Sequence, residues 1–530
     1  MAQNLLNTTE CDNNGQYNKN SWLGCEPEIA KEQIKEVLET EMLVIGGGLG
    51  GLVCAASGAE SGVKTLLIEK RGMFASTKNE FAGIASRLQN AAGSVTDKWK
   101  LIHDAIMYSA DYIDEKLWRL WADESGEAID WLEDRFGEGG SVLWFQGGYE
   151  QDATDGYGFS KYLCGHRPNW GKLAGSKILG NYAAAFGTEI RMNTGLVKLI
   201  REEGRVTGCI AEDFAEGGYI QINASKGVVI ATGGYAKNIK MLEALQPYTR
   251  DIICATVCDG FGMGDGIRAC IWAGAKFDDV HTSIVFDRGV LRVNETPRTC
   301  SLDGETNELN AQPWLKVNLN GERFANESVP YDFILHAASL QPGQCYCVIF
   351  DSKYEKDIEN FEMAGCSRLV PFANGAPISH TLPEMNAKLE RQLADGRYVK
   401  ADTLEELADQ LNIPAYALIQ TVNRYNELCS IGKDKDFGKL PHHLSSITEP
   451  PFFGCRTCGF ILSTVDGIRI NTDMNALDED FIPIPGLYVV GNDSGGYFAR
   501  TYFSNVTGCA AGRTLTFARR AAKKIAGHIK

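Results

Sequence analysis

The sequence predicts an α/β protein with two lobes, and three observations support this prediction. A short apolar strand, Glu41 to Ile45, runs straight into a Gly-rich turn at residues 46–51, and a helix and a second strand follow. A second Gly-rich turn follows the strand Gly227 to Ala231. From Phe277 to His443 the β-α-β rhythm gives way to mixed short strands and helices. Together these features predict a Rossmann-like dinucleotide-binding domain, assembled from both ends of the chain, with an inserted α+β cap domain.

The expected domain boundaries follow the same changes of pattern. Residues 1–37 form a polar, Asn-rich leader that is expected to be partly disordered, and residues 38–276 form the first part of the dinucleotide-binding domain. Residues 277–443 form the substrate cap, and residues 444–530 form the second part. The leader lacks the basic and apolar regions of an export signal, and no apolar run is long enough to span a bilayer. The expected location is therefore the cytoplasm, without membrane insertion.

The bulk composition excludes some classes of partner. The chain of 530 residues has a formal net charge of -16 and a pI near 5.1, which disfavours binding to nucleic acid or to an anionic membrane. A chain of this length does not need disulfides as a scaffold, so we expect its 16 cysteines to be buried thiols in a reducing compartment. Cys455 and Cys458 form an isolated C-x-x-C pair, which favours free structural thiols over a metal site. No metal site is predicted.

The first Gly-rich turn has the spacing of a dinucleotide-binding motif. Gly46 allows the tight turn, Gly48 lets the backbone approach a pyrophosphate, and Gly51 lets the helix pack against the strand. The N-terminus of the following helix offers free N–H groups to the phosphates. Glu69, with Lys70 beside it, ends the second strand about twenty residues on, where an acidic side chain accepts hydrogen bonds from ribose hydroxyls.

Two later segments indicate FAD rather than NAD as the cofactor. The run from Gly227 to Gly234, with Gly233 in its turn, resembles the second Gly-rich turn of two-dinucleotide-binding flavoproteins. The run from Gly486 to Asp493 resembles their C-terminal strand, whose acidic residue holds the ribityl chain. Val197, in the meander between the two halves, completes the predicted FAD contacts. No second G-x-G-x-x-G unit with a following acidic residue is present, so the electron donor is expected to be external and is not identified by the sequence.

The order of these parts resembles the fumarate reductase and succinate dehydrogenase flavoprotein family and its 3-ketosteroid dehydrogenase relatives. The resemblance extends from Glu39 onward and is most specific in the dinucleotide turn, the helix start at residues 262–266, the run Gly321 to Glu327 and the C-terminal Gly-rich turn. It implies a cap that closes over a substrate stacked against the flavin. It also implies hydride transfer to one carbon of an activated C=C bond and proton transfer to the other.

The resemblance also implies candidate proton donors. Arg323 matches the proton-donating arginine of the family's fumarate reductases, with His281 and Glu295 as candidate relay residues. The alternative for Arg323 is a structural ion pair with Glu327, and the alternative for His281 is a histidine with a purely structural role.

Departures from the family pattern change the expected substrate. Ser463 stands where fumarate reductases keep a carboxylate-binding histidine, and Arg500 is only a partial counterpart of their second carboxylate-binding arginine. Tyr502 and Ser504 resemble the Tyr-x-Ser of ketosteroid Δ4-dehydrogenases, and Tyr331 follows the arginine motif. A phenol can donate to a ketone oxygen or protonate an enolate carbon without a permanent charge.

These residues favour reduction of an enone, with a 3-oxo-Δ4 steroid or bile-acid intermediate as the first candidate substrate. Tyr502 and Ser504 would polarise the ketone, and Tyr331 or Arg323 would supply the proton. The alternatives are a fumarate- or urocanate-type enoate reductase that uses Arg323 and Arg500, an oxidase of the aspartate oxidase type, and a non-catalytic flavin redox subunit.

Overall fold

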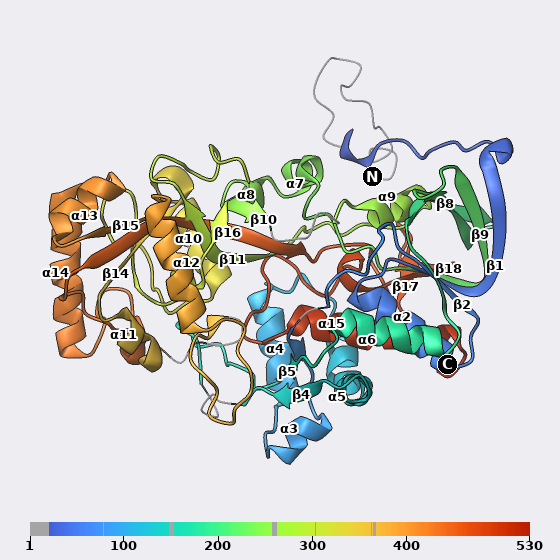
Figure 1. Ribbon diagram of the computed structural model, residues 1–530, viewed down its shortest axis with the longest axis horizontal. Helices are drawn as coiled ribbons and strands as arrows, with labels where there is room; N and C mark the ends of the chain where they lie inside the picture. The colour runs from blue at the N-terminus through green and yellow to red at the C-terminus, as the bar shows by residue number, and fades with distance from the viewer. Residues whose placement is uncertain are drawn as a thin grey trace.

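The computed structural model describes residues 21–77, 79–147, 153–256, 262–302, 304–361, 363 and 367–529. Two lobes lie side by side, as Figure 1 shows. A large sheet that includes β1 (Ile34–Ile45) occupies one end of the molecule, and the cap helices α13 (Leu404–Leu411) and α14 (Ala415–Ile431) occupy the other. The predicted α/β architecture is confirmed.

The first lobe is built on an eight-stranded sheet whose main path runs β17-β18-β9-β1-β2-β6. β1 pairs in parallel with both β2 and β9, and β9 pairs in parallel with β18. The C-terminal strand thus adds to a sheet begun by the N-terminal one, so the lobe is assembled from both ends of the chain. Its other strands are β2 (Thr65–Ile68), β6 (Glu189–Arg191), β7 (Thr194–Glu202), β8 (Arg205–Asp213), β9 (Tyr219–Ile230), β17 (Asn475–Leu477) and β18 (Pro483–Val489).

The first strand begins earlier than the sequence analysis predicted. β1 pairs with β9 from Ile34 onward, so residues 34–37 belong to the sheet and not to a leader. The early half of β1 alternates between half-buried and exposed side chains, whereas Met42 to Ile45 are all buried. The alternation indicates a strand covered on one face, and the apolar end indicates a strand covered on both.

Small residues allow close helix packing beside this sheet. Figure 1 shows α2 (Leu49–Glu60), α6 (Gly175–Ala185) and α15 (Cys509–Ile525) together on one side of it, and α5 (Glu115–Glu138) packs against α15. Every residue of α2 except Glu60 is buried, because glycine and alanine let α15 and α6 approach its backbone.

The cap is organised around one long strand, β16 (Phe452–Thr464), which is the centre of a seven-stranded sheet. β16 was expected in the second part of the dinucleotide-binding domain, and β10 (Ile253–Thr256) in the first part. Both belong to the cap sheet, because β10, β11, β14 and β15 all pair with β16. The remaining strands of this sheet are β11 (Ser283–Leu291), β12 (Glu305–Thr306), β13 (Leu315–Val317), β14 (Tyr346–Asp351) and β15 (Tyr398–Ala401).

A third, small sheet and several helices lie around the junction of the lobes. The sheet contains β3 (Phe81–Ala82), β5 (Gly165–Asn169) and β4 (Val142–Phe145), in that order. The remaining α-helices are α3 (Arg87–Ala91), α4 (Lys98–Tyr108), α7 (Ile239–Leu245), α8 (Pro247–Arg250), α9 (Asp265–Trp272), α10 (Tyr331–Ser339), α11 (Tyr354–Asn360) and α12 (Leu382–Ala394). Within the described residues, no helix combines the length and apolar character needed to cross a membrane.

The packing of α15 on β3 gives a stability prediction. A Cβ added at Gly512 would lie 2.0 Å from the carbonyl oxygen of Ala82, so the helix must shift to accept Gly512→Ala. We expect this variant to lose about 2–3 kcal/mol of unfolding free energy through overpacking. Gly137→Ala, at an exposed position of α5, is the matched control, because nothing lies within 4 Å of its added Cβ. Thermal unfolding of the two variants should show a lower melting temperature for Gly512→Ala alone; equal melting temperatures would contradict the predicted clash.

Candidate functional site

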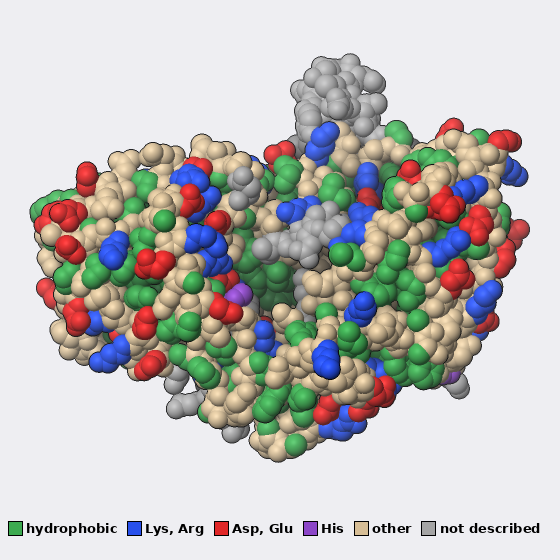
Figure 2. Space-filling view, viewed as in Figure 1, with side chains coloured by type: hydrophobic (Ala, Val, Ile, Leu, Met, Phe, Trp, Pro, Cys, Tyr) green, Lys and Arg blue, Asp and Glu red, His purple; other side chains and the backbone are tan. Residues whose placement is uncertain are grey.

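A cavity of about 720 Å³ lies between the two lobes and reaches the first Gly-rich turn at one end. Figure 2 shows the hollow that separates the lobes. The cavity wall combines residues of the Gly-rich turns, of the cap and of the segment that precedes α15. A site formed between domains in this way is the usual location for a cofactor and its substrate.

The first Gly-rich turn has the close contacts that its glycines predict. Gly46 has a φ of 113°, and a Cβ there would lie 2.3 Å from the carbonyl oxygen of Ala231. A Cβ at Gly51 would lie 1.8 Å from the carbonyl oxygen of Gly46. Gly48 is the N-cap of α2 and lines the cavity, so the free N–H groups of the helix start lie beside the cavity. This arrangement suits a diphosphate.

The acidic end of β2 is tied to this turn. Glu69 lines the cavity, and its carboxylate accepts hydrogen bonds from the backbone N–H of Gly47 at 2.6 Å and of Arg71 at 3.0 Å. Lys70 also lines the cavity and forms an ion pair with Asp265 at 2.8 Å. Val197 is not among the lining residues, whereas its neighbour Leu196 is. Glu69 and Lys70, which were predicted to contact FAD, therefore line the cavity, and Leu196 lines it in place of Val197.

The second Gly-rich turn is held by Asp493. Its carboxylate accepts hydrogen bonds from the N–H and hydroxyl of Thr232, from the N–H of Gly233 at 2.9 Å and from the N–H of Gly234 at 2.9 Å. Asp493 is fully buried and does not line the cavity, whereas Gly233 and Asn492 do. Asp493 thus holds the turn, whereas Asn492, which precedes it, lines the cavity.

Asn492 was not identified by the sequence analysis. Its amide donates to the Ser463 hydroxyl at 2.6 Å, and its oxygen accepts from the guanidinium of fully buried Arg513 at 3.2 Å. Burial lowers the pKa of Arg513 to about 10. Residues 491–493 form a 3-10 turn, so their side chains do not alternate between two faces as they would in a strand. The strand pattern in the sequence therefore could not show which of positions 492 and 493 lines the cavity.

Three predicted substrate residues meet at the other part of the cavity. Tyr502 and Ser504 come from the segment before α15, and Tyr331 is the first residue of α10. The Tyr502 oxygen accepts a hydrogen bond from the backbone N–H of Ala510 at 3.2 Å, at the N-terminus of α15. The Tyr331 ring packs on Phe286 with a centroid distance of 4.4 Å. Ser463 also lines this region, as its family position implied.

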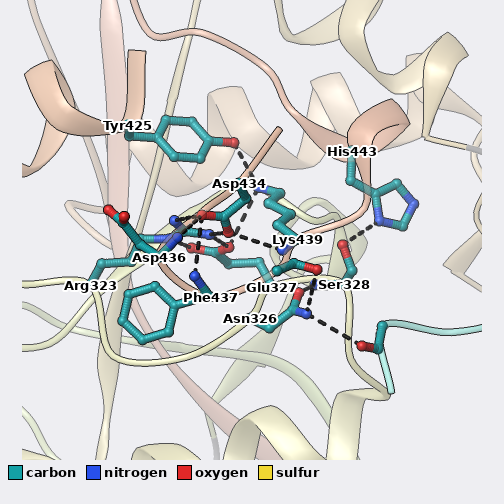
Figure 3. Close-up of polar contacts among 12 residues, drawn as sticks. Arg323, Asn326, Glu327, Ser328, Tyr425, Asp434, Asp436, Phe437, Lys439 and His443 are labelled. Atoms are coloured by element: carbon teal, nitrogen blue, oxygen red, sulfur yellow. Dashed lines mark hydrogen bonds and ion pairs between the residues drawn. The ribbon is translucent and has the colours of Figure 1, made fainter. Parts of the chain in front are cut away.

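Arg323 lies outside the cavity, in the ion-pair cluster drawn in Figure 3. Its guanidinium donates to Glu327 at 2.6 and 2.7 Å and to Asp434 at 2.7 and 3.1 Å. Burial alone would lower the pKa of Arg323, but the hydrogen bonds and charges of these two carboxylates raise it above its usual value. In this geometry Arg323 forms the structural ion pair with Glu327 that was the alternative interpretation, and the proton-donor role stays a prediction that the position of Arg323 outside the cavity disfavours.

The other predicted polar residues also lie elsewhere. His281 hydrogen-bonds to buried Asp466 at 2.8 Å and does not line the cavity. Glu295 accepts from the backbone N–H of Arg292 at an exposed site. Arg500 is exposed, has a φ of 63°, and stacks over Tyr112 at 4.2 Å. Neither the predicted relay nor the predicted Arg323–Arg500 pair is assembled at the cavity.

Three arginines that line the cavity, Arg71, Arg167 and Arg288, were missed by the sequence analysis. Arg288 on β11 donates to Ser367 at 2.7 Å, and Arg167 on β5 donates to Ser379 at 2.7 Å and to Glu80 at 3.3 Å. Neither belongs to a spaced motif, so only the tertiary structure brings them to the cavity wall.

Comparison with known proteins agrees with this geometry. Residues 41–504 match the FAD binding domain family. The chain is 27% identical over 480 residues to a vinyl phenol reductase of Lactiplantibacillus plantarum, covering 89% of this chain and 93% of that protein. It is 28% identical over 505 residues to a probable fumarate reductase of Shewanella frigidimarina, covering 92% of this chain and 75% of that protein. A solved structure of 3-ketosteroid delta1-dehydrogenase from Sterolibacterium denitrificans has the same fold, with a TM-score of 0.70 at 19% identity, over 93% of this chain and 100% of that one.

The role of Asp493 can be tested by cofactor retention. Asp493→Ala removes the acceptor of four hydrogen bonds from the turn at Thr232 to Gly234, so the turn should loosen and FAD affinity should fall about tenfold or more. Asp478→Ala, on the exposed turn before β18, is the control. Released flavin can be quantified by its fluorescence after gel filtration. Equal FAD retention in both variants would show that the turn holds its shape without Asp493.

Substitution of Arg323 distinguishes a structural role of this side chain from a role in proton transfer. Arg323→Ala leaves Glu327 and Asp434 without their guanidinium partner, which should cost about 3–5 kcal/mol of unfolding free energy. The turnover per bound FAD should nevertheless change little, because Arg323 does not reach the cavity. Arg500→Ala is the comparison and should change neither quantity. A large loss of turnover in folded, FAD-loaded Arg323→Ala would restore the proton-donor role.

Proposed function

Because the chain belongs to the FAD binding domain family, we propose that it is an FAD-dependent oxidoreductase that reduces a C=C bond conjugated to an uncharged oxygen group. The substrate class that we propose is the α,β-unsaturated ketone, with a 3-oxo-Δ4 steroid or bile-acid-type enone as the first candidate.

One observation carries this proposal. Tyr502, Ser504 and Tyr331 line the cavity, whereas Arg323 and Arg500, the pair that an enoate reductase was predicted to use, lie outside it. Neutral hydroxyl donors suit a neutral ketone oxygen, because they stabilise its developing negative charge without a permanent positive charge.

Tyr502 is well placed to polarise a ketone. Its oxygen accepts the backbone N–H of Ala510, and accepting a hydrogen bond makes the phenol a stronger donor. Ala510 lies in the first turn of α15, where the helix dipole is positive. Both effects stabilise a negatively charged enolate oxygen beside Tyr502 and Ser504 more than they stabilise the neutral ketone. Stronger interaction with the developing charge than with the bound substrate is what lowers the barrier.

The remaining proton would come from Tyr331. Bound FAD supplies the hydride that adds to the carbon β to the ketone, C5 in a 3-oxo-Δ4 steroid. Tyr331, held at the start of α10 against Phe286, would donate its phenolic proton to C4, and solvent would reprotonate it. The electrons would reach the protein from an external donor whose identity is left open.

A second candidate function is reduction of an enoate. Arg288 and Arg167 line the cavity and could bind a carboxylate, and relatives of this chain include a probable fumarate reductase. In that case these two arginines, and not Arg323 and Arg500, would hold the substrate. Both already contact cap or neighbouring side chains, which makes the neutral substrate the preferred proposal.

Tyr502→Phe tests the proposal. The change removes one donor to the developing enolate, so turnover of a 3-oxo-Δ4 steroid should fall about a hundredfold while FAD stays bound. Tyr497→Phe is the matched control, because its buried hydroxyl contacts Cys509 and does not line the cavity. Turnover is measured anaerobically with reduced viologen as electron donor.

The same assay with a panel of acceptors separates the alternatives. The panel contains the steroid, a vinylphenol, fumarate, urocanate and a cinnamate. Reduction of carboxylates alone, or full steroid activity in Tyr502→Phe, would reject the tyrosine site in favour of Arg288 and Arg167. Flavin that reduces and reoxidises without converting any acceptor would indicate a redox subunit, and rapid formation of hydrogen peroxide in air would indicate an oxidase.

A further inference from the structure

A hydrogen-bonded chain leads from the cavity to a buried carboxyl group that the proposed reaction does not use. Ser504 lines the cavity, and its side chain lies beside the Tyr108 hydroxyl at the end of α4, close enough to act on the pKa of Tyr108. The Tyr108 hydroxyl hydrogen-bonds to Asp332 Oδ1 at 3.0 Å. Tyr108 and Asp332 are both buried and neither lines the cavity. Tyr108 and Ser504 therefore link the Asp332 side chain to the cavity.

Aromatic packing fixes this chain of hydroxyl groups. The Tyr108 ring contacts Phe159, Phe333 and Phe503, with centroid distances of 5.3, 4.8 and 5.0 Å. These contacts hold the Tyr108 oxygen between Asp332 and Ser504, so the three groups can exchange donor and acceptor roles without moving their heavy atoms.

The surroundings of Asp332 place its titration in the neutral range. Burial raises the pKa of Asp332 to about 7, against the lowering effect of hydrogen bonds from Tyr108 and from backbone N–H groups at the start of α10 and at Tyr502. Tyr331 on α10 is a titratable group close enough to Tyr108 to act on its pKa, and His336 lies one turn beyond Asp332 along the same helix. Burial lowers the pKa of His336 to about 4, so it is neutral while Asp332 titrates.

The charge of Asp332 decides which way the hydroxyl hydrogens point. An ionised carboxylate can only accept, so Tyr108 donates to Asp332, Ser504 donates to Tyr108, and the Ser504 oxygen presents a lone pair to the cavity. A protonated carboxyl group can donate to Tyr108, which then donates to Ser504, and the Ser504 hydroxyl points into the cavity as a donor. The change takes up one proton at Asp332 and reorients two hydroxyl groups.

We propose that Asp332 is a positioning residue that sets, through Tyr108, whether Ser504 offers the substrate oxygen a proton donor or an acceptor. This inference rests on the proposed function, in which Ser504 faces the oxygen of an enone. With Asp332 protonated the site binds a carbonyl oxygen, and with Asp332 ionised it binds a hydroxyl group. Carbonyl binding is therefore complete at low pH and is lost as the pH rises through the pKa of Asp332.

Ligand binding to the oxidised holoenzyme tests the proposal. A 3-oxo-Δ4 steroid and its 3-hydroxy counterpart are titrated at pH values below and above the pKa of Asp332, and binding is followed by the change in flavin absorbance. The affinity for the ketone should fall about tenfold per pH unit above that pKa, towards a lower limit. The affinity for the hydroxy ligand should rise over the same range.

Three variants test whether the pH dependence of ketone binding arises from Asp332, Tyr108 and Ser504. In Asp332→Asn the amide donates to Tyr108 at every pH, so ketone affinity should stay high and lose its pH dependence. Tyr108→Phe cuts the chain, so the profile should be flat and ketone binding weaker. Asp104→Asn is the matched control, because Asp104 lies on the same helix and pairs with Tyr162 at 2.6 Å without contact with the cavity. It should keep the wild-type profile.

Infrared difference spectra without a ligand keep this proposal separate from the proposed function. A carboxyl band that titrates in the wild type, is missing in Asp332→Asn and shifts in Tyr108→Phe supports the chain even if the steroid does not bind. Absence of steroid binding at every pH would reject the enone assignment alone. A wild-type pH profile in Asp332→Asn, or no titrating carboxyl band, would overturn the role of Asp332.

Discussion

The backbone N–H groups of residues 232–234 project from the end of β9 into a turn that has no regular secondary structure to satisfy them. The carboxylate of Asp493 accepts all three, together with the Thr232 hydroxyl, although its own burial is costly. This cluster fastens the C-terminal part of the chain to the middle part. Gly46 then packs against the carbonyl oxygen of Ala231, which fastens the N-terminal part to both. The cavity exists because these three segments meet here.

The segments that build the cofactor half could be predicted from the sequence, because each depends on a local conformation. A glycine at φ 113°, or the start of a helix after a strand, can be recognised from a few consecutive residues. The cap sheet has no local sequence motif of this kind. β16 was divided from the cap because its pairing partners lie up to two hundred residues away, and sequence periodicity does not record which strand a neighbour is.

The substrate half was predicted in part, for a related reason. The motif around Arg323 was recognised, yet a motif gives the position of a side chain along the chain and not its direction. Arg323 contacts Asp434, over a hundred residues later, and does not line the cavity, whereas Tyr331 does. Tyr502 and Ser504 were found because their Tyr-x-Ser run resembles that of ketosteroid Δ4-dehydrogenases, and both line the cavity. Asp332 carries no signal in the sequence, since only the fold brings Tyr108 beside it.

β16 also links the far side of the cap to the flavin site. It is a continuous strand of 13 residues, about 43 Å in length, that starts among the cap strands at Phe452. It ends at Ser463, which accepts from Asn492, and at Thr464, which accepts from the backbone N–H of Tyr235. A rigid strand transmits a small rotation at one end as a displacement at the other. A tilt of the cap sheet would therefore displace Ser463 and Thr464, and with them their contacts to Asn492 and Tyr235, so the position of the cap is mechanically coupled to this wall of the cavity.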